Sequence, residues 1–275
     1  AWSRRKGSWP RVFGWVKSFL TLVLLASPEV RSLGDRQAWV SPSPEKGRAA
    51  LVVLHASASS AGQIERLTGF SQLEDKPTVL YPEATEGGWN VGRPDAFPSP
   101  GPQDDVAFVD QCLSLAVNEY GADARRLFVV GFDSGGDLAL LCGLRLNRLT
   151  GVACCMGGLT PALGAPSTTP LLTIASEADP CFPFQGGPIR YFGGRSRGQI
   201  LSSDELMRRW SGQLQPTAVD GIKENWGPKC LRYRLKTAGH LWPGTEAPVS
   251  EQMFGPLARD FQATQAVWDF FKAIP

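Results

Sequence analysis

Apolar and polar positions along the chain form two alternating patterns. Continuously apolar runs, typical of strands buried on both faces of a sheet, predict strands at Ala50–His55, Thr78–Tyr81, Arg126–Phe132, Gly151–Met156, Pro170–Ser176 and Cys230–Lys236, with a shorter one near Gln37–Val40. Helical periodicity predicts helices over Ala61–Leu73, Asp104–Tyr120, Ser134–Leu146 and Ser202–Leu214, and one long or two short helices over Met253–Ala273. This alternation predicts an α/β protein with a parallel sheet and ligands bound at the carboxyl ends of its strands.

Two segments rich in glycine interrupt the alternation. Residues 83–103 also contain several prolines and Trp89, and irregular loops of that length are usually functional or disordered. Residues 186–199 (GGPIRYFGGRSRGQ) lack the Lys-Ser or Lys-Thr that completes a phosphate loop. We expect this second segment to form a mobile surface insertion near the loop that follows the strand at Pro170–Ser176.

The beginning of the chain has a composition of its own. Residues 1–17 are basic and aromatic, and residues 18–26 (SFLTLVLLA) are apolar, as in a signal peptide. The apolar run is short for a membrane span. We therefore expect a signal-peptide-like or basic/apolar segment over residues 1–30, one domain over 31–275, and a secreted or periplasmic protein without a stable membrane span in its mature form. An amphipathic first helix is the alternative.

Charge and cysteine content exclude several kinds of site. The net charge of +2 is too small to indicate a nucleic-acid partner. None of the six cysteines forms a CxxC pair, so we expect no metal site, and no motif calls for a cofactor. Cys181 and Cys230 lie in predicted loop or strand-edge positions, where they could pair or remain thiols. The chain has only two histidines, His55 and His240, so imidazole chemistry must use one of them.

A sharp turn is predicted where the strand at Arg126–Phe132 meets the next helix. A nucleophile elbow needs small residues two positions before and two after its vertex. Gly131 and Gly135 satisfy this rule for Asp133, whereas Phe132 excludes Ser134 from the vertex. Asp133 therefore takes the place of a nucleophile, and the backbone N–H of Ser134 is placed to serve as an oxyanion donor.

Four segments resemble the polyhydroxybutyrate depolymerase and feruloyl esterase-like family of α/β hydrolases. YGADARRLFVVGFDSGGDLAL resembles its elbow, which has serine where this chain has Asp133; LVVLHASASSAGQIERLTGFSQL, LLTIASEADPCFPFQGG and AGHLWPG resemble its oxyanion strand, acid loop and histidine loop. The resemblance runs from about Val40 to Phe271. It implies an α/β-hydrolase fold and small-molecule or polymeric ester substrates, and the short segment between Asp133 and Pro170 leaves no room for a large cap domain. It also implies that Asp133, Asp179 and His240 act as nucleophile, acid and base.

Further site residues are predicted around this triad. Ala56 and Ser57 follow the strand at Ala50–His55 as an oxyanion turn, with Ala56 where the family usually has glycine. Trp89 and Trp242 lie in loops, where they would either line a substrate pocket or fill the core.

The aspartate at the elbow leaves three functions open. A carboxylate that attacks an ester forms a mixed anhydride and must expel a poor alkoxide. It is better suited to displacement at saturated carbon, as in hydrolases of halides and epoxides, but Ser134 stands where the dehalogenase pattern has tryptophan. The hypotheses are thus a carboxylic ester hydrolase (polyester or aromatic ester class) with an atypical Asp nucleophile, a catalytically inactive hydrolase-fold binding protein, or an Asp-nucleophile hydrolase of halides or epoxides.

Overall fold

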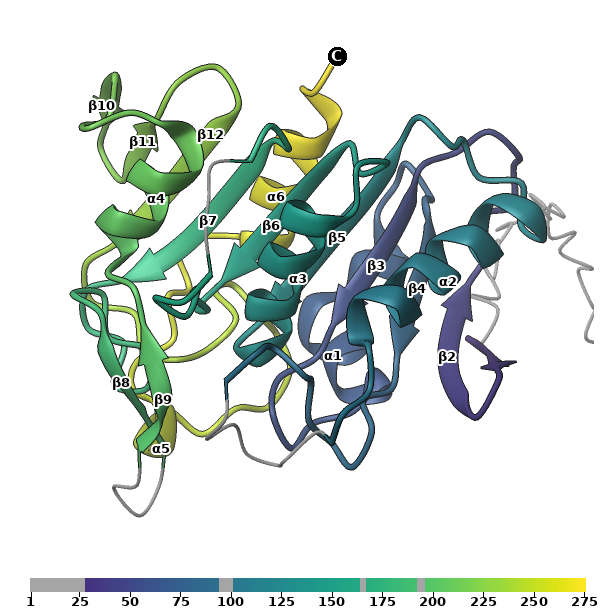
Figure 1. The fold of residues 1–275 in the computed structure, drawn as a ribbon, viewed down its shortest axis with the longest axis horizontal. Helices are drawn as coiled ribbons and strands as arrows, with labels where there is room; N and C mark the ends of the chain where they lie inside the picture. The colour runs from purple at the N-terminus through teal and green to yellow at the C-terminus, as the bar shows by residue number, and fades with distance from the viewer. Residues whose placement is uncertain (1–27, 94–100, 164–166, 192–195) are drawn as a thin grey trace, which may run out of the picture.

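A computed structural model describes residues 28–93, 101–163, 167–191 and 196–275. The expected signal-like segment lies mostly outside these residues, and the first strand already begins at Glu29. Figure 1 shows a twisted central sheet with helices packed against it. None of the helices in the described ranges is long and apolar enough to cross a membrane.

The centre of the sheet is parallel, as the apolar runs predict. The parallel strands are, in spatial order, β4 (Thr78–Pro82), β3 (Ala50–Leu54), β5 (Leu127–Phe132), β6 (Gly151–Cys155), β7 (Leu171–Ser176) and β12 (Cys230–Leu235). Antiparallel strands complete both edges: β2 (Arg36–Ser41) and β1 (Glu29–Leu33) beside β4, β11 (Lys223–Asn225) and β10 (Ala218–Asp220) beside β12. Every residue of β3, β4, β5 and β6 is buried, because helices cover both faces.

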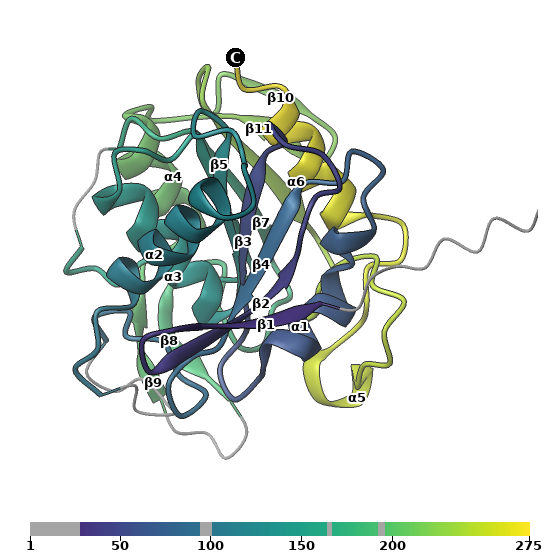
Figure 2. The ribbon, with the colours of Figure 1, turned by 90° about the vertical axis from the view of Figure 1, so that its right-hand side faces the viewer.

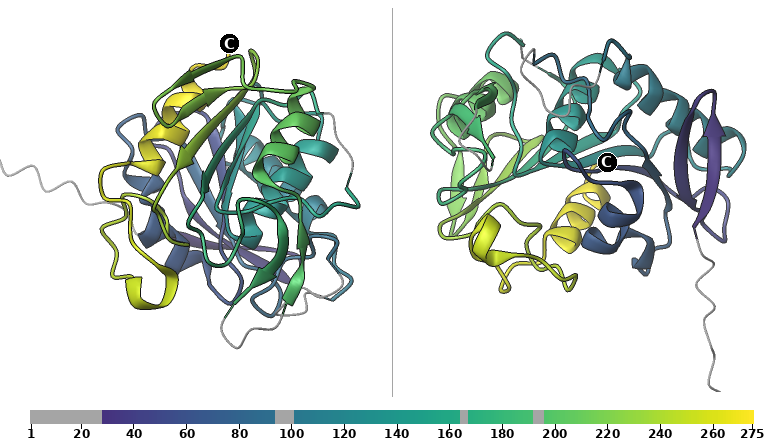
Figure 3. Two further views of the ribbon diagram at one scale, coloured as in Figure 1. Left: turned by 90° about the vertical axis from the view of Figure 1, so that its left-hand side faces the viewer. Right: turned by 90° about the horizontal axis from the view of Figure 1, so that it is seen from below.

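The helices form two layers. One face of the sheet is covered by α2 (Asp105–Asn118), α3 (Ser134–Arg145) and α4 (Ser203–Ser211), and the other by α1 (Ala61–Thr68) and α6 (Ala263–Lys272) (Figures 2 and 3). Two separate hydrophobic clusters fill these layers, one containing Leu138 and Trp210 and the other Ile64 and Phe271. β6 ends at Cys155 and β7 begins at Leu171, which leaves no room between them for a cap domain.

One predicted helix is clearly shorter in the structure, and the C-terminal region takes the second of its two expected forms, two short helices. The helix expected over Ala61–Leu73 ends at Thr68, because Gly69 adopts a left-handed φ of 63° and caps it, and a 3₁₀ turn, η1 (Phe70–Gln72), follows. The C-terminal region forms two helices, α5 (Glu251–Phe254) and α6. The shorter of these, α5, lies beside the carboxyl ends of the parallel strands.

The insertion predicted over residues 186–199 lies near the acid loop, as expected, but its described part is a regular hairpin and not a mobile segment. These residues form an antiparallel hairpin of β8 (Gly187–Arg190) and β9 (Ser196–Ile200). Ile189 and Ile200 are buried beside Cys181 and Phe182 of the loop after β7. In Figure 1 the hairpin lies below the arrowhead of β7, beyond the carboxyl ends of the parallel strands, where the sequence predicts the site.

Cys181 and Cys230 do not pair. Both are buried free thiols, like the other four cysteines. Cys230 begins β12 at the amino ends of the parallel strands, whereas Cys181 follows β7 at their carboxyl ends. The length of the sheet therefore separates the two residues.

Candidate active site

The predicted elbow is present at the end of β5. Asp133 adopts φ 59° and ψ −129°, a strained conformation for a residue that is not glycine. A Cβ on Gly131 would overlap the carbonyl of Gly135, and a Cβ on Gly135 would overlap the carbonyl oxygen of Leu54. The two glycines thus allow β5, α3 and β3 to approach closely enough to hold Asp133 at the vertex.

Asp133, His240 and Asp179 form a continuous hydrogen-bonded chain. His240 follows β12, and its Nε2 lies 2.9 Å from Asp133 Oδ2 while its Nδ1 lies 2.8 Å from Asp179 Oδ2. Asp179 follows β7, and its other oxygen accepts the N–H groups of Cys181 and Phe182 at 2.8 and 2.9 Å. The three residues predicted as nucleophile, acid and base are thus brought together, and all three side chains are buried.

The second oxygen of Asp133 lies at the predicted oxyanion turn. Asp133 Oδ1 accepts the backbone N–H of Ser134, and that of Ser57 at 3.3 Å. The hydroxyl of Ser57 donates to that of Ser134 at 2.8 Å, which ties the two donor segments together. The pair of backbone donors expected to receive a substrate oxygen therefore already holds the carboxylate of Asp133.

The hydrogen bonds and charges within the triad set the protonation states of Asp133 and His240. Burial alone raises the pKa of Asp133, but hydrogen bonds from His240, Tyr191 and Ser134 outweigh burial and hold that pKa below its ordinary value. Burial likewise lowers the pKa of His240, but the charge of Asp179 and hydrogen bonds to both carboxylates raise it to about 10. His240 is consequently an imidazolium at neutral pH, between two carboxylates.

Aromatic rings hold the imidazole in place. The ring of Phe182 stacks on that of His240 with centroids 5.1 Å apart and planes 8° apart. Phe132 stacks on His240 with a centroid distance of 5.1 Å. Because both rings also exclude water, they strengthen the electrostatic interactions of the buried triad.

A cavity of about 480 Å³ opens onto Asp133 and His240. Its wall is mostly apolar. The apolar lining residues are Ala56, Ala58, Leu67, Phe132, Leu241, Trp242, Val249, Met253 and Phe254, and Ser57, Tyr191 and Arg197 are polar members beside Asp133 and His240. A mostly apolar pocket with a few convergent polar groups is typical of small-molecule sites.

Some of the residues predicted to line the pocket lie in the cavity wall, and others do not. Ala56, Ser57 and Trp242 line the cavity, although Trp242 is itself buried and its Nε1 donates to Thr264 Oγ1. Trp89 does not line it, so of the two roles expected for this residue it takes the one in the core. Its indole N–H donates to the carbonyl oxygen of His55 at 2.8 Å and its ring packs on the imidazole of His55, so it supports the oxyanion turn from behind.

His55 itself shapes that turn. Its Nε2 accepts the N–H of Ala84 at 3.1 Å, so its Nδ1 carries the proton and donates to the carbonyl oxygen of Ala56 at 2.8 Å. Burial lowers the pKa of His55 to about 4, which keeps the ring neutral. The C=O and N–H of a trans peptide point in opposite directions. By fixing the Ala56 carbonyl, His55 directs the Ser57 N–H towards Asp133.

Sequence reasoning missed Tyr191. Its hydroxyl donates to Asp133 Oδ2, the oxygen that also faces His240. The residue directly follows β8, in the segment that we expected to be a mobile insertion. The predicted position of this segment near the acid loop is the one signal that could have found Tyr191, but nothing in the sequence indicates that its hydroxyl reaches Asp133.

Three residues at the site could in principle bind a metal ion. Ligand atoms of Asp179, Cys181 and His240 lie within 4.8 Å of one another. However, both oxygens of Asp179 and both ring nitrogens of His240 are engaged in hydrogen bonds. Burial raises the pKa of the Cys181 thiol to about 12, and a protonated thiol is a poor ligand. The donor set fits a hydrogen-bonded triad better than a metal site.

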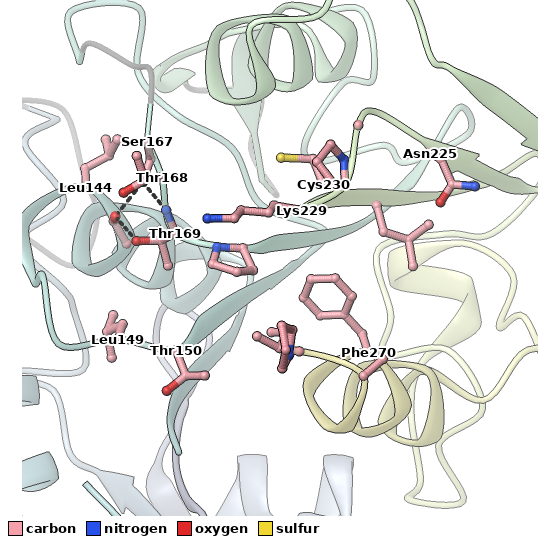
Figure 4. A pocket seen from close by; sticks show the side chains of 18 of the residues that line it. Leu144, Leu149, Thr150, Ser167, Thr168, Thr169, Asn225, Lys229, Cys230 and Phe270 are labelled. Carbon is pink, nitrogen blue, oxygen red and sulfur yellow. Dashed lines mark hydrogen bonds between the residues drawn. The ribbon is translucent and has the colours of Figure 1, made fainter. Parts of the chain in front are cut away.

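A larger hollow of about 940 Å³ lies at the opposite end of the sheet, near the beginnings of β6, β7 and β12 (Figure 4). Its wall contains none of the predicted site residues. The hydroxyls of Ser167 and Thr169 both donate to the carbonyl oxygen of Gly143, at 2.9 and 3.0 Å. These polar groups therefore join α3 to the loop before β7 and are not convergent on the hollow.

Comparison with known proteins supports the hydrolase interpretation. No family model matches the chain. Over 260 residues it is 25% identical to a Nocardia uniformis subsp. tsuyamanensis protein named "Putative esterase NocK", covering 84% of this chain and 76% of that protein. It is 24% identical over 188 residues to feruloyl esterase B of Piromyces equi, covering 66% of this chain and only 32% of that enzyme.

Solved structures show the same fold. The acetyl xylan esterase from Aspergillus awamori superposes with a TM-score of 0.60 at 12% identity, covering 87% of this chain and 99% of the esterase. Together with the mostly parallel sheet, this similarity confirms the predicted α/β-hydrolase fold. The esterase relatives support a carboxylic ester hydrolase as the general class.

Proposed function

We propose that this protein hydrolyses carboxylic esters with Asp133 as a covalent nucleophile and His240 as a proton donor and then acceptor. The observation that carries the proposal is the placement of the two oxygens of Asp133. Oδ2 faces His240 Nε2 at 2.9 Å beside the cavity, while Oδ1 accepts backbone N–H groups of Ser57 and Ser134. One oxygen is thus directed at a substrate and the other is anchored.

In the first step, Oδ2 attacks the acyl carbon of the ester. The new Oδ2–C bond forms, the carbonyl π electrons move to the substrate oxygen, and collapse then breaks the bond to the leaving group. The leaving oxygen takes the proton from His240 Nε2, which the raised pKa of His240 keeps available at neutral pH. The product of this step is a mixed anhydride on Asp133, with a neutral His240.

In the second step, water attacks the Cγ of Asp133. His240 Nε2 accepts a proton from the water, and Asp179 orients the imidazole through Nδ1. The negative charge develops on Oδ1, where the N–H groups of Ser57 and Ser134 already lie. When the Cγ–Oδ2 bond breaks, Oδ2 departs in the carboxylate product and the oxygen from water remains on Asp133. The second proton of the water leaves Asp133 for the departing carboxylate, so the acid product carries it away and the Asp133–His240 ion pair is restored.

The weak nucleophilicity of a carboxylate limits the substrates. Even with the proton from His240, the leaving group must compete with the Asp133 carboxylate for departure from the tetrahedral intermediate, which favours phenol and enol esters over simple alkyl esters. The apolar cavity of about 480 Å³ suits a small aromatic or short acyl ester. We therefore propose aromatic, activated esters as the substrate class, in preference to alkyl polyesters.

One observation favours a second function. The carboxylate of Asp133 fills the oxyanion position and satisfies both His240 and Tyr191, much as a bound carboxylic acid product would. A protein locked in this state would be a catalytically inactive member of the hydrolase fold that binds an apolar ligand in the cavity.

A comparison of variants tests the proposal. Purified protein is assayed on 4-nitrophenyl acetate and butyrate, and on haloalkanes and epoxides, alongside Asp133→Asn and His240→Ala, with Asp220→Asn on the exposed strand β10 as a matched control. We expect aryl ester turnover that falls by about 10³-fold or more in the first two variants and is unchanged in the control. No turnover by the wild type, or full activity of Asp133→Asn, would overturn the proposal. If the protein turns over only haloalkanes or epoxides, the proposed ester hydrolysis is wrong and Asp133 instead attacks a saturated carbon.

A further inference from the structure

Tyr191 lines the cavity and, like His240, touches the reactive oxygen of Asp133. Its phenolic O–H donates to Oδ2, and Tyr191 itself lines the cavity. The hydroxyl therefore lies where an ester carbonyl must arrive for Oδ2 to reach its acyl carbon.

In the first chemical step, the carbonyl oxygen of the substrate needs a hydrogen-bond donor that the two steps described above do not supply. As Oδ2 attacks, negative charge develops on the carbonyl oxygen of the substrate, and esterases stabilise such charge with preorganised donors. Here the backbone N–H groups of Ser57 and Ser134 are engaged by Oδ1 of Asp133. The N–H of His240 is required by the leaving group. The substrate oxyanion thus requires another donor.

We propose that Tyr191 is a further catalytic residue, whose hydroxyl donates to the substrate oxyanion during the attack by Asp133. This inference rests on the proposed function. As the substrate enters, the hydrogen bond of Tyr191 moves from Oδ2 to the adjacent carbonyl oxygen, which also frees a lone pair on Oδ2. No proton is transferred in this exchange, because His240 supplies the proton that the leaving group takes. The chain then has two oxyanion sites, one for each step.

The hairpin holds the hydroxyl in position. The ring of Tyr191 makes edge contacts with Phe182 and His240, with centroids 6.2 and 6.4 Å away. The N–H of Arg190 donates to the carbonyl oxygen of Cys181 at 3.0 Å, which joins the hairpin to the loop that carries Asp179. Tyr191 is therefore placed by the same loop that places the acid.

The state of the phenol suits this role. Burial and the charge of Asp133 raise the pKa of Tyr191 well above its ordinary value. The hydroxyl thus remains a donor throughout the pH range in which Asp133 is ionised.

Tyr191→Phe tests the inference, because it removes the hydroxyl and keeps the ring contacts. Release of 4-nitrophenolate is followed by stopped flow to isolate the first step, with Tyr233→Phe as control, since Tyr233 lies on β12 against Phe261 and away from the cavity wall. We expect the first step to slow by about 10²- to 10³-fold in Tyr191→Phe, with breakdown of the intermediate and the control unaffected. An unchanged first step in Tyr191→Phe, with an active wild type, would overturn the inference and leave the proposed function standing. An inactive wild type would instead overturn the proposed function.

A second substitution covers the case in which Tyr191→Phe fails to fold. Incorporation of 3-fluorotyrosine at position 191 preserves the shape of the side chain and makes its hydroxyl a stronger donor. We expect a faster first step for the fluorinated protein at pH 7. A rate equal to that of the wild type would contradict the role of Tyr191 as an oxyanion donor.

Discussion

Asp133 Oδ2 and His240 Nε2 lie 2.9 Å apart, and the opposite nitrogen of His240 lies 2.8 Å from Asp179. In a serine triad the histidine has one carboxylate partner and begins the reaction as a neutral base. Here a second carboxylate replaces the hydroxyl, so the histidine begins as a cation. The order of proton transfers is thereby reversed, because His240 first donates and then accepts.

The pH dependence of activity follows from this charge state. The pKa of His240 is raised to about 10 and that of Asp133 is lowered, so the active ion pair is present across neutral pH. We expect kcat/KM for an aryl ester to be flat from about pH 5 to 9 and to fall as the pH rises through about 10, where His240 loses its proton. Titration of His240 by NMR should show the same midpoint. A rise in activity through pH 6 to 7, as expected for a neutral histidine base, would contradict the account.

Asp133→Ser should convert the site to ordinary serine chemistry. The substitution removes one carboxylate, which lowers the pKa of His240, and it frees the N–H groups of Ser57 and Ser134 for a substrate oxygen. We expect the variant to hydrolyse simple alkyl esters that the wild type does not, with activity that rises through pH 6 to 8. Asp133→Ala, which empties the site without adding a nucleophile, serves as control. Equal leaving-group preference in Asp133→Ser and wild type would argue against Asp133 as the nucleophile.

The order and position of the triad are predictable from sequence, whereas its resting state is not. Gly131 and Gly135 identify Asp133 as the vertex, and Asp179 and His240 follow strands whose carboxyl ends meet at one edge. Oδ1 of Asp133 occupies the oxyanion site, and a serine side chain has no corresponding second oxygen. The resemblance to serine esterases therefore does not predict this occupation.

The positions of individual loop residues at the site are also not predictable from the sequence. Trp89 and Trp242 have similar surroundings in the sequence, but only Trp242 reaches the cavity, because Trp89 is required to cover His55. Tyr191 reaches Asp133 through a hairpin whose short strands carry too little apolar pattern to be predicted. Long-range packing, which is not encoded in local periodicity, decides both cases.

The elbow glycines should be intolerant of even one added methyl group. In Gly135→Ala the Cβ would overlap the carbonyl oxygen of Leu54, so the helix α3 would have to move away from β3. We expect a loss of about 3 kcal/mol in the free energy of unfolding, measured by urea denaturation. Gly212→Ala provides a matched control, because Gly212 has φ 71° and open space around it, and should cost only about 1 kcal/mol. Equal losses in the two variants would contradict the close approach at the elbow.

His55 should contribute to both stability and activity. His55→Leu leaves the N–H of Ala84 without its buried acceptor and the carbonyl of Ala56 without its imidazole donor, so we expect a loss of about 1–3 kcal/mol. Activity should fall as well, because the Ser57 N–H loses its fixed direction.

The stability of the wild type should also depend on pH through His55. The pKa of His55 in the folded protein, about 4, lies below the ordinary 6.5, so the contribution of His55 to stability is present above pH 6.5 and is lost as the pH falls towards 4. Urea denaturation at pH 7 and pH 4.5 measures both effects. A wild-type stability that is independent of pH over this range, or equal to that of His55→Leu at pH 7, would contradict the assignment.

Single-turnover hydrolysis in H₂¹⁸O tests the covalent role of Asp133 most directly. Excess protein is mixed with 4-nitrophenyl butyrate, and the acid product and the peptide that contains Asp133 are then weighed by mass spectrometry. Because water attacks Cγ in the proposed route, one ¹⁸O should appear on Asp133 and none in the butyrate. Label in the butyrate with an unlabelled Asp133 would show that water attacks the substrate carbon, and would contradict hydrolysis at Cγ of an intermediate on Asp133.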